Sequence, residues 1–357
     1  MKKESTSLTP LKRFINLLKL DKKDIYQVFF YAIFSGIVSL SLPLGIQAII
    51  NLIQGGRVSL SWIILVIVVI LGVAFNGILK LMQLRITESI QQKIFIRSSF
   101  EFSYRFPKIK YTEFNNSYPP ELANRFFDTL TVQKSVAKLI LDYSESLLQI
   151  IFGLLLLSVY HPLFILFGLL LFIVLYLIFR ISFQIGLKTS LTESKYKYKV
   201  AHWIQEIARN YFGFKSKIEA DFALAKNDKL VNEYLKSRES HFQIIKRQFI
   251  QLIGFKILIS AGLLLIGGFL VINQQINIGQ FIAADIVIIA IMGSIEKLIG
   301  VLDQVYEALT AVEKLNKNIW FSRRFSQLGR VTSLLRDNDG VVMKALVEQL
   351  WNYQLTD

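Results

Sequence analysis

Ionisable side chains inside long apolar segments are the residues of this sequence best placed to do chemistry. Asp285, Met292 and Glu296 lie within the apolar segment 278–302, and Asp303 follows it. An ionised group inside a membrane is costly, so such residues usually face water, a charged partner or a transported substrate. At about 100° per residue, the four side chains fall on one helix face to within ~20°. The spacing therefore predicts a single polar face on this helix.

Two interpretations of this polar face are open. In the first, Asp285, Met292 and Glu296 line a translocation pathway. In the second, Asp285 lies near the outer water interface, and Glu296 pairs with Lys297 or with a neighbouring helix.

The first apolar segment offers a similar choice. Gln47 and Asn51 are one turn apart and follow Pro43, which removes a helical hydrogen bond and permits a bend. These two side chains either line the same pathway or form hydrogen bonds between helices.

Paired carboxylates or clustered ligands would indicate catalysis or metal binding. Asp142 and Glu145 share a helix face, but Lys138 stands one turn before Asp142, which favours a solvated helix extension with an intrahelical ion pair. Cysteine is absent, and the three histidines lack ligand spacing (His161, His202 and His241). We therefore expect no catalytic residue, no metal and no cofactor bound by this chain.

The composition is typical of a membrane protein. Of the 357 residues, 53% are hydrophobic, and the formal net charge is +15, a combination that is rare in soluble basic domains. Lys and Arg collect between the apolar runs, as expected of loops beside an anionic membrane surface, so the expected partner is a lipid bilayer and not nucleic acid. The first apolar segment is too long for a signal-peptide core, so no secretory signal is expected.

A membrane-spanning helix needs ~20 apolar residues, because the hydrocarbon core is ~30 Å thick. Six segments qualify, at 28–53, 60–81, 139–160, 162–183, 249–272 and 278–302. Only Tyr160, His161 and Pro162 join the third segment to the fourth, which predicts a tight hairpin. The predicted fold class is an all-α membrane protein with six transmembrane helices and two long cytoplasmic helical hairpins.

Basic residues predict the orientation. Seven precede the first span, ten lie between the second and third, and fourteen lie between the fourth and fifth, whereas Arg57 is on the opposite side. By the positive-inside rule, both termini are cytoplasmic in a multi-pass protein of the plasma (inner) membrane.

The two inner connections are about 57 and 65 residues long and rich in good helix formers. We expect each to be a helical hairpin that continues the spans and reaches ~35 Å beyond the membrane. Before the first span, residues 1–24 form a cytoplasmic segment in which Thr9 and Pro10 begin an amphipathic elbow helix. Its apolar residues lie in the membrane interface or, alternatively, on protein (Leu11, Phe14, Ile15 and Leu18).

Three stretches carry a family resemblance. The first inner connection contains residues 118–128, which include two prolines and a polar helix ending in Asp128. The second contains residues 205–207 and 214–221, and the last span begins with residues 278–284 and is followed by residues 307–314. In order and spacing, these stretches, the elbow helix and the six spans resemble the transmembrane domain of type I ABC exporters, particularly those of bacterial peptide- and protein-secreting systems. The resemblance covers residues 8–316, although Pro120 stands where the family usually has Gly.

The resemblance implies partners and docking residues. It implies a permease whose pathway forms in a homodimer, or in a heterodimer with a related chain, while ABC ATPase subunits carrying ATP and Mg²⁺ dock on the inner connections. The implied docking residues are Tyr118, Glu121, Asn124, Arg125, Phe126 and Asp128 in the first connection, and Ile218, Glu219 and Asp221 in the second.

The sequence has no Gly-x-x-x-x-Gly-Lys-Ser/Thr phosphate-binding motif. Two glycine pairs have the spacing of that motif, but they lie inside spans, where we expect close helix packing (Gly72 with Gly77, and Gly262 with Gly267). We therefore expect residues 25–316 to be a transmembrane domain, residues 317–357 to be a cytoplasmic tail without an ATPase module, and the chain not to be an enzyme. The alternative is a non-transporting membrane scaffold or regulator, or a truncated remnant of a full ABC half-transporter.

Overall fold

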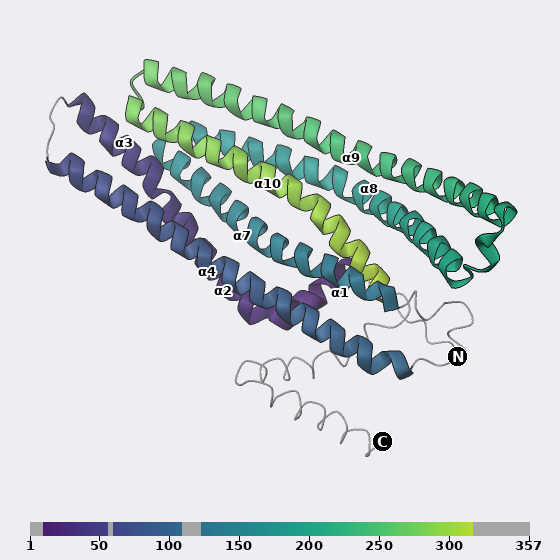
Figure 1. The fold of residues 1–357 in the computed structure, drawn as a ribbon. Coiled ribbons are helices and arrows are strands. Elements are labelled where there is room, and N and C mark those ends of the chain that lie inside the picture. Colours follow the sequence, from purple (N-terminus) through teal and green to yellow (C-terminus); the bar gives the residue numbers. More distant parts are fainter. Residues whose placement is uncertain (1–9, 56–59, 109–122, 317–357) are drawn as a thin grey trace, which may run out of the picture.

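The computed structural model describes residues 10–55, 60–108 and 123–316, and it is helical over nearly all of them, with no strand in these ranges (Figure 1). The helices are α1 (Pro10–Leu18), α2 (Lys22–Ser39), α3 (Ser41–Gln54), α4 (Leu60–Arg105), α7 (Asp128–Tyr160), α8 (Pro162–Arg209), α9 (Lys217–Ile272) and α10 (Ile278–Asn316). Short 3-10 turns join them: η1 (Lys19–Asp21), η2 (Phe106–Lys108), η3 (Arg125–Phe127) and η4 (Gly213–Lys215).

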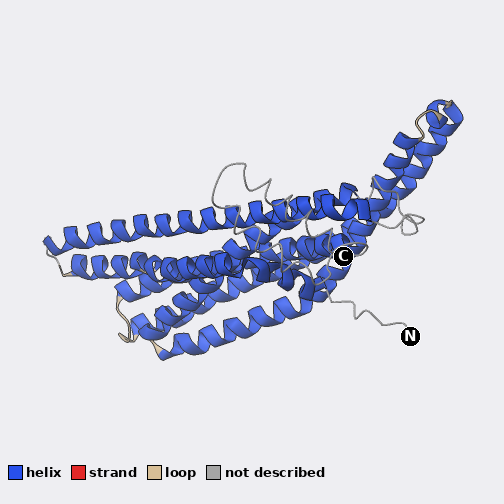
Figure 2. Ribbon diagram, turned by 90° about the horizontal axis from the view of Figure 1, so that it is seen from below, coloured by secondary structure: helices blue, strands red, loops and turns tan. Residues whose placement is uncertain are grey.

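The prediction of six helices long and apolar enough to cross a membrane is confirmed for the described residues. Several are much longer than a bilayer requires. The 56 residues of α9 extend ~84 Å, against a hydrocarbon core of ~30 Å. The excess lies where α8 and α9 are joined, and there the two helices project from the rest of the bundle (Figure 2). We call this end of the molecule the arm side and the opposite end the outer side.

The second inner connection is a helical hairpin, as predicted from its composition. α8 continues to Arg209, and α9 begins at Lys217, where Ser216 caps the helix by accepting a hydrogen bond from the backbone N–H of Glu219 at 3.3 Å. The predicted tight hairpin on the outer side is also present. α7 ends at Tyr160, and the His161 ring nitrogen Nδ1 accepts from the backbone N–H of Leu163 at 3.1 Å at the start of α8.

The first span bends, as predicted, near Pro43. α2 ends at Ser39 and α3 begins at Ser41, so the break lies at Leu40. Proline has no backbone N–H, so Pro43 cannot donate to the carbonyl of Ser39, four residues earlier. The next residue, Leu44, donates normally to Leu40 at 3.1 Å, which confines the bend to one turn.

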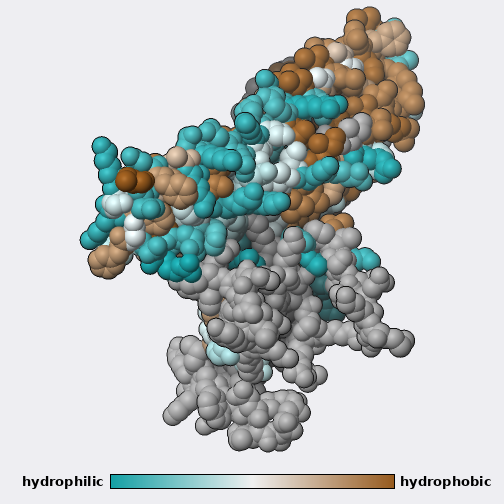
Figure 3. All heavy atoms as spheres, turned by 90° about the vertical axis from the view of Figure 1, so that its right-hand side faces the viewer, coloured by the Kyte–Doolittle hydropathy of each residue, from teal (hydrophilic) through white to brown (hydrophobic). Residues whose placement is uncertain are grey.

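Two hydrophobic cores hold the bundle together, and α7 and α10 contribute to both. The outer core contains buried residues of α7, α8, α9 and α10, including Leu157, Phe164, Ile259 and Ile288. The arm-side core joins α1, α2 and α4 to α7 and α10, through residues such as Phe14, Val28, Ile90 and Leu309. Hydrophobic surface gathers toward one end of the molecule and hydrophilic surface toward the other (Figure 3).

The elbow helix α1 packs partly on protein. Phe14 and Leu17 are buried in the arm-side core, and the Arg13 guanidinium lies 2.5 Å from the Glu313 carboxylate of α10. Leu11 and Ile15 remain exposed. The expected packing on protein therefore holds for one half of its apolar surface, which contacts α10. The other half faces outward, where the alternative position in a membrane interface remains open to it.

The expected close packing at glycines holds for three of the four positions. A Cβ atom at Gly72 would lie 2.5 Å from Ser41 Oγ, at Gly262 2.3 Å from the Phe167 ring, and at Gly267 2.7 Å from the Phe281 ring. The prediction for Gly77 is wrong, because no atom lies within 4 Å of a Cβ built there. Gly77 faces outward from α4, a helix with neighbours on only part of its surface.

Candidate functional site

The predicted polar face of α10 lies along α9. Three of its side chains have partners on that helix. Met292 Sδ lies 3.7 Å from Ser260 Oγ, and the Glu296 carboxylate lies 2.5 Å from Lys256 Nζ. About two turns after Glu296 on α10, Asp303 is 3.5 Å from the buried His241 ring of α9.

Asp285, nearer the outer side, is half-buried on the same helix. It lies seven residues after the first residue of α10, Ile278, which corresponds to ~10 Å along the helix axis. Glu296 pairs with Lys256 of the neighbouring helix α9 and not with the adjacent Lys297. Of the two partners that the sequence left open for Glu296, the structure thus has the one on a neighbouring helix.

Gln47 and Asn51 meet other helices at the outer end. The Tyr160 hydroxyl donates to Gln47 Oε1 at 2.5 Å, joining α3 to the end of α7. Asn51 lies against α10, since a Cβ atom at Gly279 would be 2.4 Å from Asn51 Oδ1. Both residues thus make contacts between helices.

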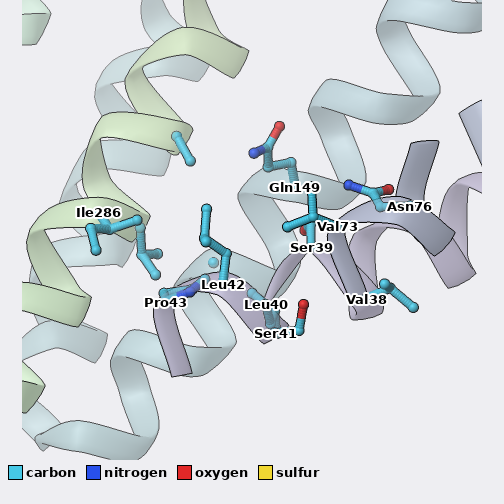
Figure 4. A pocket seen from close by; sticks show the side chains of 13 residues that line it. Val38, Ser39, Leu40, Ser41, Leu42, Pro43, Val73, Asn76, Gln149 and Ile286 are labelled. Carbon is cyan, nitrogen blue, oxygen red and sulfur yellow. The ribbon is translucent and has the colours of Figure 1, made fainter. Parts of the chain in front are cut away.

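A cavity of about 230 Å³ lies at the break between α2 and α3. Residues from the break form one wall, and α4, α7 and α10 provide the others, as Figure 4 shows with Asn76, Gln149 and Ile286. Most of the lining is apolar, and no charged side chain belongs to it: Val38, Ser39, Leu40, Ser41, Leu42, Pro43, Val73, Asn76, Gln149, Gly153, Ile286, Val287 and Ala290.

The two amides that line this cavity have their oxygens occupied. The Ser35 hydroxyl donates to Asn76 Oδ1 at 2.5 Å, and the Ser294 hydroxyl donates to Gln149 Oε1 at 2.9 Å. A primary amide also carries two N–H donors, so both side chains keep donor capacity at the cavity. The buried hydroxyl oxygen of Ser41 has no hydrogen-bond partner among the described residues.

One helical turn from the amides, toward the arm side, charged residues from three helices meet. The Glu145 carboxylate of α7 pairs with Lys80 of α4 and, at 3.2 Å, with Lys297 of α10. The interaction expected within α7 between Lys138 and Asp142 is one part of a wider charge network. Asp142 interacts with the charges of both Lys297 and Lys138, and Glu145 is paired across helices. Sequence reasoning did not identify Lys80 or Lys256 as members of a site.

The end of the first inner connection is anchored to its neighbours. The Phe126 ring lies 5.5 Å from Phe95 and 5.3 Å from Phe102, both on α4. The Tyr198 hydroxyl of α8 donates to the carboxylate of Asp128, the first residue of α7.

Burial and the neighbouring carboxylate of Asp128 raise the pKa of Tyr198, while the nearby Arg125 acts in the opposite sense. Asn124, which directly precedes the 3-10 turn η3, is exposed. Tyr118 and Glu121, two further predicted docking residues, lie outside the described residues.

The tip of the second inner connection carries exposed apolar side chains. Ile218 is 81% exposed and Phe212 is 70% exposed, and Glu219 and Asp221 are also exposed in the first turns of α9. Beneath them Trp203 is buried, donates to the Ala223 carbonyl at 3.1 Å, and has the Lys226 ammonium 3.7 Å above its ring. The packed side chain of Trp203 thus supports a tip at which large apolar side chains are exposed.

No model of a known protein family matches this chain, and no curated protein has a similar sequence at a significant level. Within residues 10–55, 60–108 and 123–316, no group of three or more His, Cys, Asp or Glu side chains is placed to hold a metal ion.

Proposed function

We propose that the chain is the membrane-spanning subunit of an ATP-driven exporter of the type I ABC class. Two copies, or one copy and a related chain, would form the pathway, and separate ATPase subunits would dock on the inner connections. ATP-driven closure of the ATPase pair would then be transmitted through the long helices to the spans.

The observation that carries this proposal is the α8–α9 arm with its apolar tip. Beyond residue 183, where the fourth apolar segment ends, α8 continues to Arg209, a distance of ~39 Å. A side chain there cannot contact anything inside the bilayer. Large exposed apolar residues such as Ile218 and Phe212 on a helical projection are typical of a surface that binds another protein.

Polar residues along the spans support a pathway for the transported molecule. The candidates are Gln47 and Asn51 at the outer end, followed by Asp285, Met292 and Glu296 along α10. Polar and charged side chains inside a membrane are costly, so residues retained at such depths are candidates for a function.

The proposal is tested by purifying the full chain from its native cells with and without changes at the arm tip. Wild-type chain is expected to co-purify with an ATPase subunit and to show no ATP hydrolysis once that subunit is removed. The double variant Phe212→Ser with Ile218→Ser should keep expression and membrane insertion but lose the ATPase.

Leu235→Ser is the matched control, since Leu235 is an exposed apolar residue of α9 more than four turns from Ile218. Loss of the ATPase in this control as well would indicate general damage to the arm. ATP hydrolysis by the isolated chain, or retention of the partner by the tip variant, would refute the proposal.

A further inference from the structure

The cavity at the α2–α3 break and the charged residues beside it form a continuous surface. Asn76 and Lys80 are one turn apart on α4, and Gln149 and Glu145 are one turn apart on α7. The bonds Ser294–Gln149 and Lys297–Glu145 fix the same register between α7 and α10. Moving toward the arms, a ligand would therefore meet an apolar cavity, then two amides, then two lysines.

The lysines carry an excess of positive charge. Lys80 and Lys297 share one carboxylate, that of Glu145, which leaves one net positive charge. Including Lys138 and Asp142, the next charged pair toward the arms, does not change the excess. Each ammonium has three N–H donors, and both lysine side chains are about half exposed, at 49% and 48%. They remain able to bind an anion.

The depth of these residues in a bilayer agrees with a lipid headgroup. Lys80 follows the first residue of α4, Leu60, by twenty positions, or ~30 Å, which is the thickness of the hydrocarbon core. The lysines thus lie at the boundary on the arm side, and the cavity lies within the hydrocarbon. Leu42 and Val73 in the cavity lining are 40% and 51% exposed, so the cavity opens to the outside of the bundle.

We propose that this surface binds one anionic phospholipid of the arm-side leaflet, with its phosphate at Lys80 and Lys297 and part of an acyl chain in the cavity. The amide donors of Asn76 and Gln149 lie about one turn, ~5 Å, further into the membrane, where the ester carbonyls of such a lipid would accept hydrogen bonds. The cavity holds about eight times the ~30 Å³ of one water molecule, which is room for a length of acyl chain and not for a folded substrate. The site does not depend on export activity.

The test is native mass spectrometry of the full chain released from nanodiscs of phosphatidylcholine with a minor fraction of phosphatidylglycerol. Wild-type chain should retain phosphatidylglycerol far above its share in the disc. Lys80→Gln and Lys297→Gln, made singly so that Glu145 keeps one lysine, should each lower this enrichment about tenfold, as expected for a lost charge-assisted hydrogen bond. Ala290→Leu, which fills the cavity and leaves both lysines in place, should lower it similarly.

Arg85→Gln is the matched control, because it removes an exposed positive charge from the same helix, α4, and should leave the enrichment unchanged. A second measurement needs no variant: ether-linked phosphatidylglycerol, which lacks the carbonyls, should be retained several-fold less than the ester form. Retention of both headgroups by wild-type chain in the proportion of the disc would overturn the proposal. So would enrichment that survives both the lysine changes and Ala290→Leu. Neither result bears on whether an ATPase docks at the arm tip.

Discussion

The two inner connections continue long helices, and their described parts lie in different surroundings. At the end of the first, Phe126 packs between two rings of α4, and Asp128 is held by Tyr198. At the tip of the second, Phe212 and Ile218 project from a small aromatic base. The described end of the first connection, residues 123–128, is thus positioned by its neighbours, whereas the tip of the second is supported only by its own base.

The family resemblance implies the same role, docking of an ATPase, for residues of both connections. The structure separates residues that stabilise the fold from residues that are exposed to a partner. A residue whose side chain is packed inside its own chain contributes to stability, and its replacement disturbs the fold before it disturbs a partner. An exposed tip residue contributes little to stability, so its replacement reports on the partner. The contrast predicts that the two connections respond differently to the same type of mutation, and the following changes test it in order of decreasing effect.

Phe126→Ala should have the largest effect on the free energy of unfolding. It removes the ring contacts with Phe95 and Phe102, and we expect a loss of about 2 kcal/mol for this partly buried side chain. Thermal unfolding of the purified chain in detergent measures the change. A variant as stable as wild type would mean that the end of the first connection is not anchored.

Tyr198→Phe should cost about 1–2 kcal/mol, because it removes the donor to the Asp128 carboxylate and leaves the ring in place. The raised pKa of Tyr198 sets the pH dependence. A folded-state pKa above the unfolded value of ~10 means that the protonated phenol stabilises the fold fully below pH ~10, and that this stabilisation is lost as pH rises through the folded-state value. The difference between variant and wild type should therefore be constant from about pH 6 to 9. A difference that changes within that range would contradict the assignment.

Lys226→Gln should cost about 0.5–1 kcal/mol at the base of the second connection, since it removes the ammonium above the Trp203 ring. Lys226→Arg serves as the control, because a guanidinium also stacks on aromatic rings. Tryptophan fluorescence during unfolding is a suitable measurement. Equal losses in the two variants would show that the charge above the ring does not matter.

Phe212→Ala should have the smallest effect, within about 0.5 kcal/mol, as for other exposed positions. The same unfolding assay that detects the loss in Phe126→Ala provides the comparison. A substantial destabilisation by Phe212→Ala would remove the distinction between the two connections and would weaken the case for a docking tip.

Hydrophobic length and helix punctuation were sufficient to predict the spans, the hairpin at His161 and the bend near Pro43. Periodicity also placed Met292, Glu296 and Asp303 on one face of α10. It could not show that this face meets α9, because a helical period fixes which residues share a face and not which helix lies against it. The partner of Glu296 on α9, Lys256, follows from packing.

The cluster of Lys80, Glu145 and Lys297 was beyond sequence analysis for a related reason. Glu145 is 65 positions from Lys80 and 152 positions from Lys297 in the chain. No local pattern connects such residues, and only the way α7 lies between α4 and α10 brings them together. Gly77 shows the reverse error, in which a local pattern predicts a contact that is absent. Its spacing suggested close helix packing, but it lies on a side of α4 where no atom is within 4 Å of an added Cβ.

The contact between the elbow helix and α10 has a consequence for biosynthesis. Arg13 and Glu313 are 300 positions apart, and at a synthesis rate of ~5–20 residues per second the partner appears about 15–60 s after the elbow helix has been made. During that interval α10, the helix that α1 packs against, has not been made, so we expect the apolar side of α1 to rest largely in the membrane interface. The helix would then be transferred from lipid to protein as the last span is inserted, and it would complete the arm-side core as a late step of assembly.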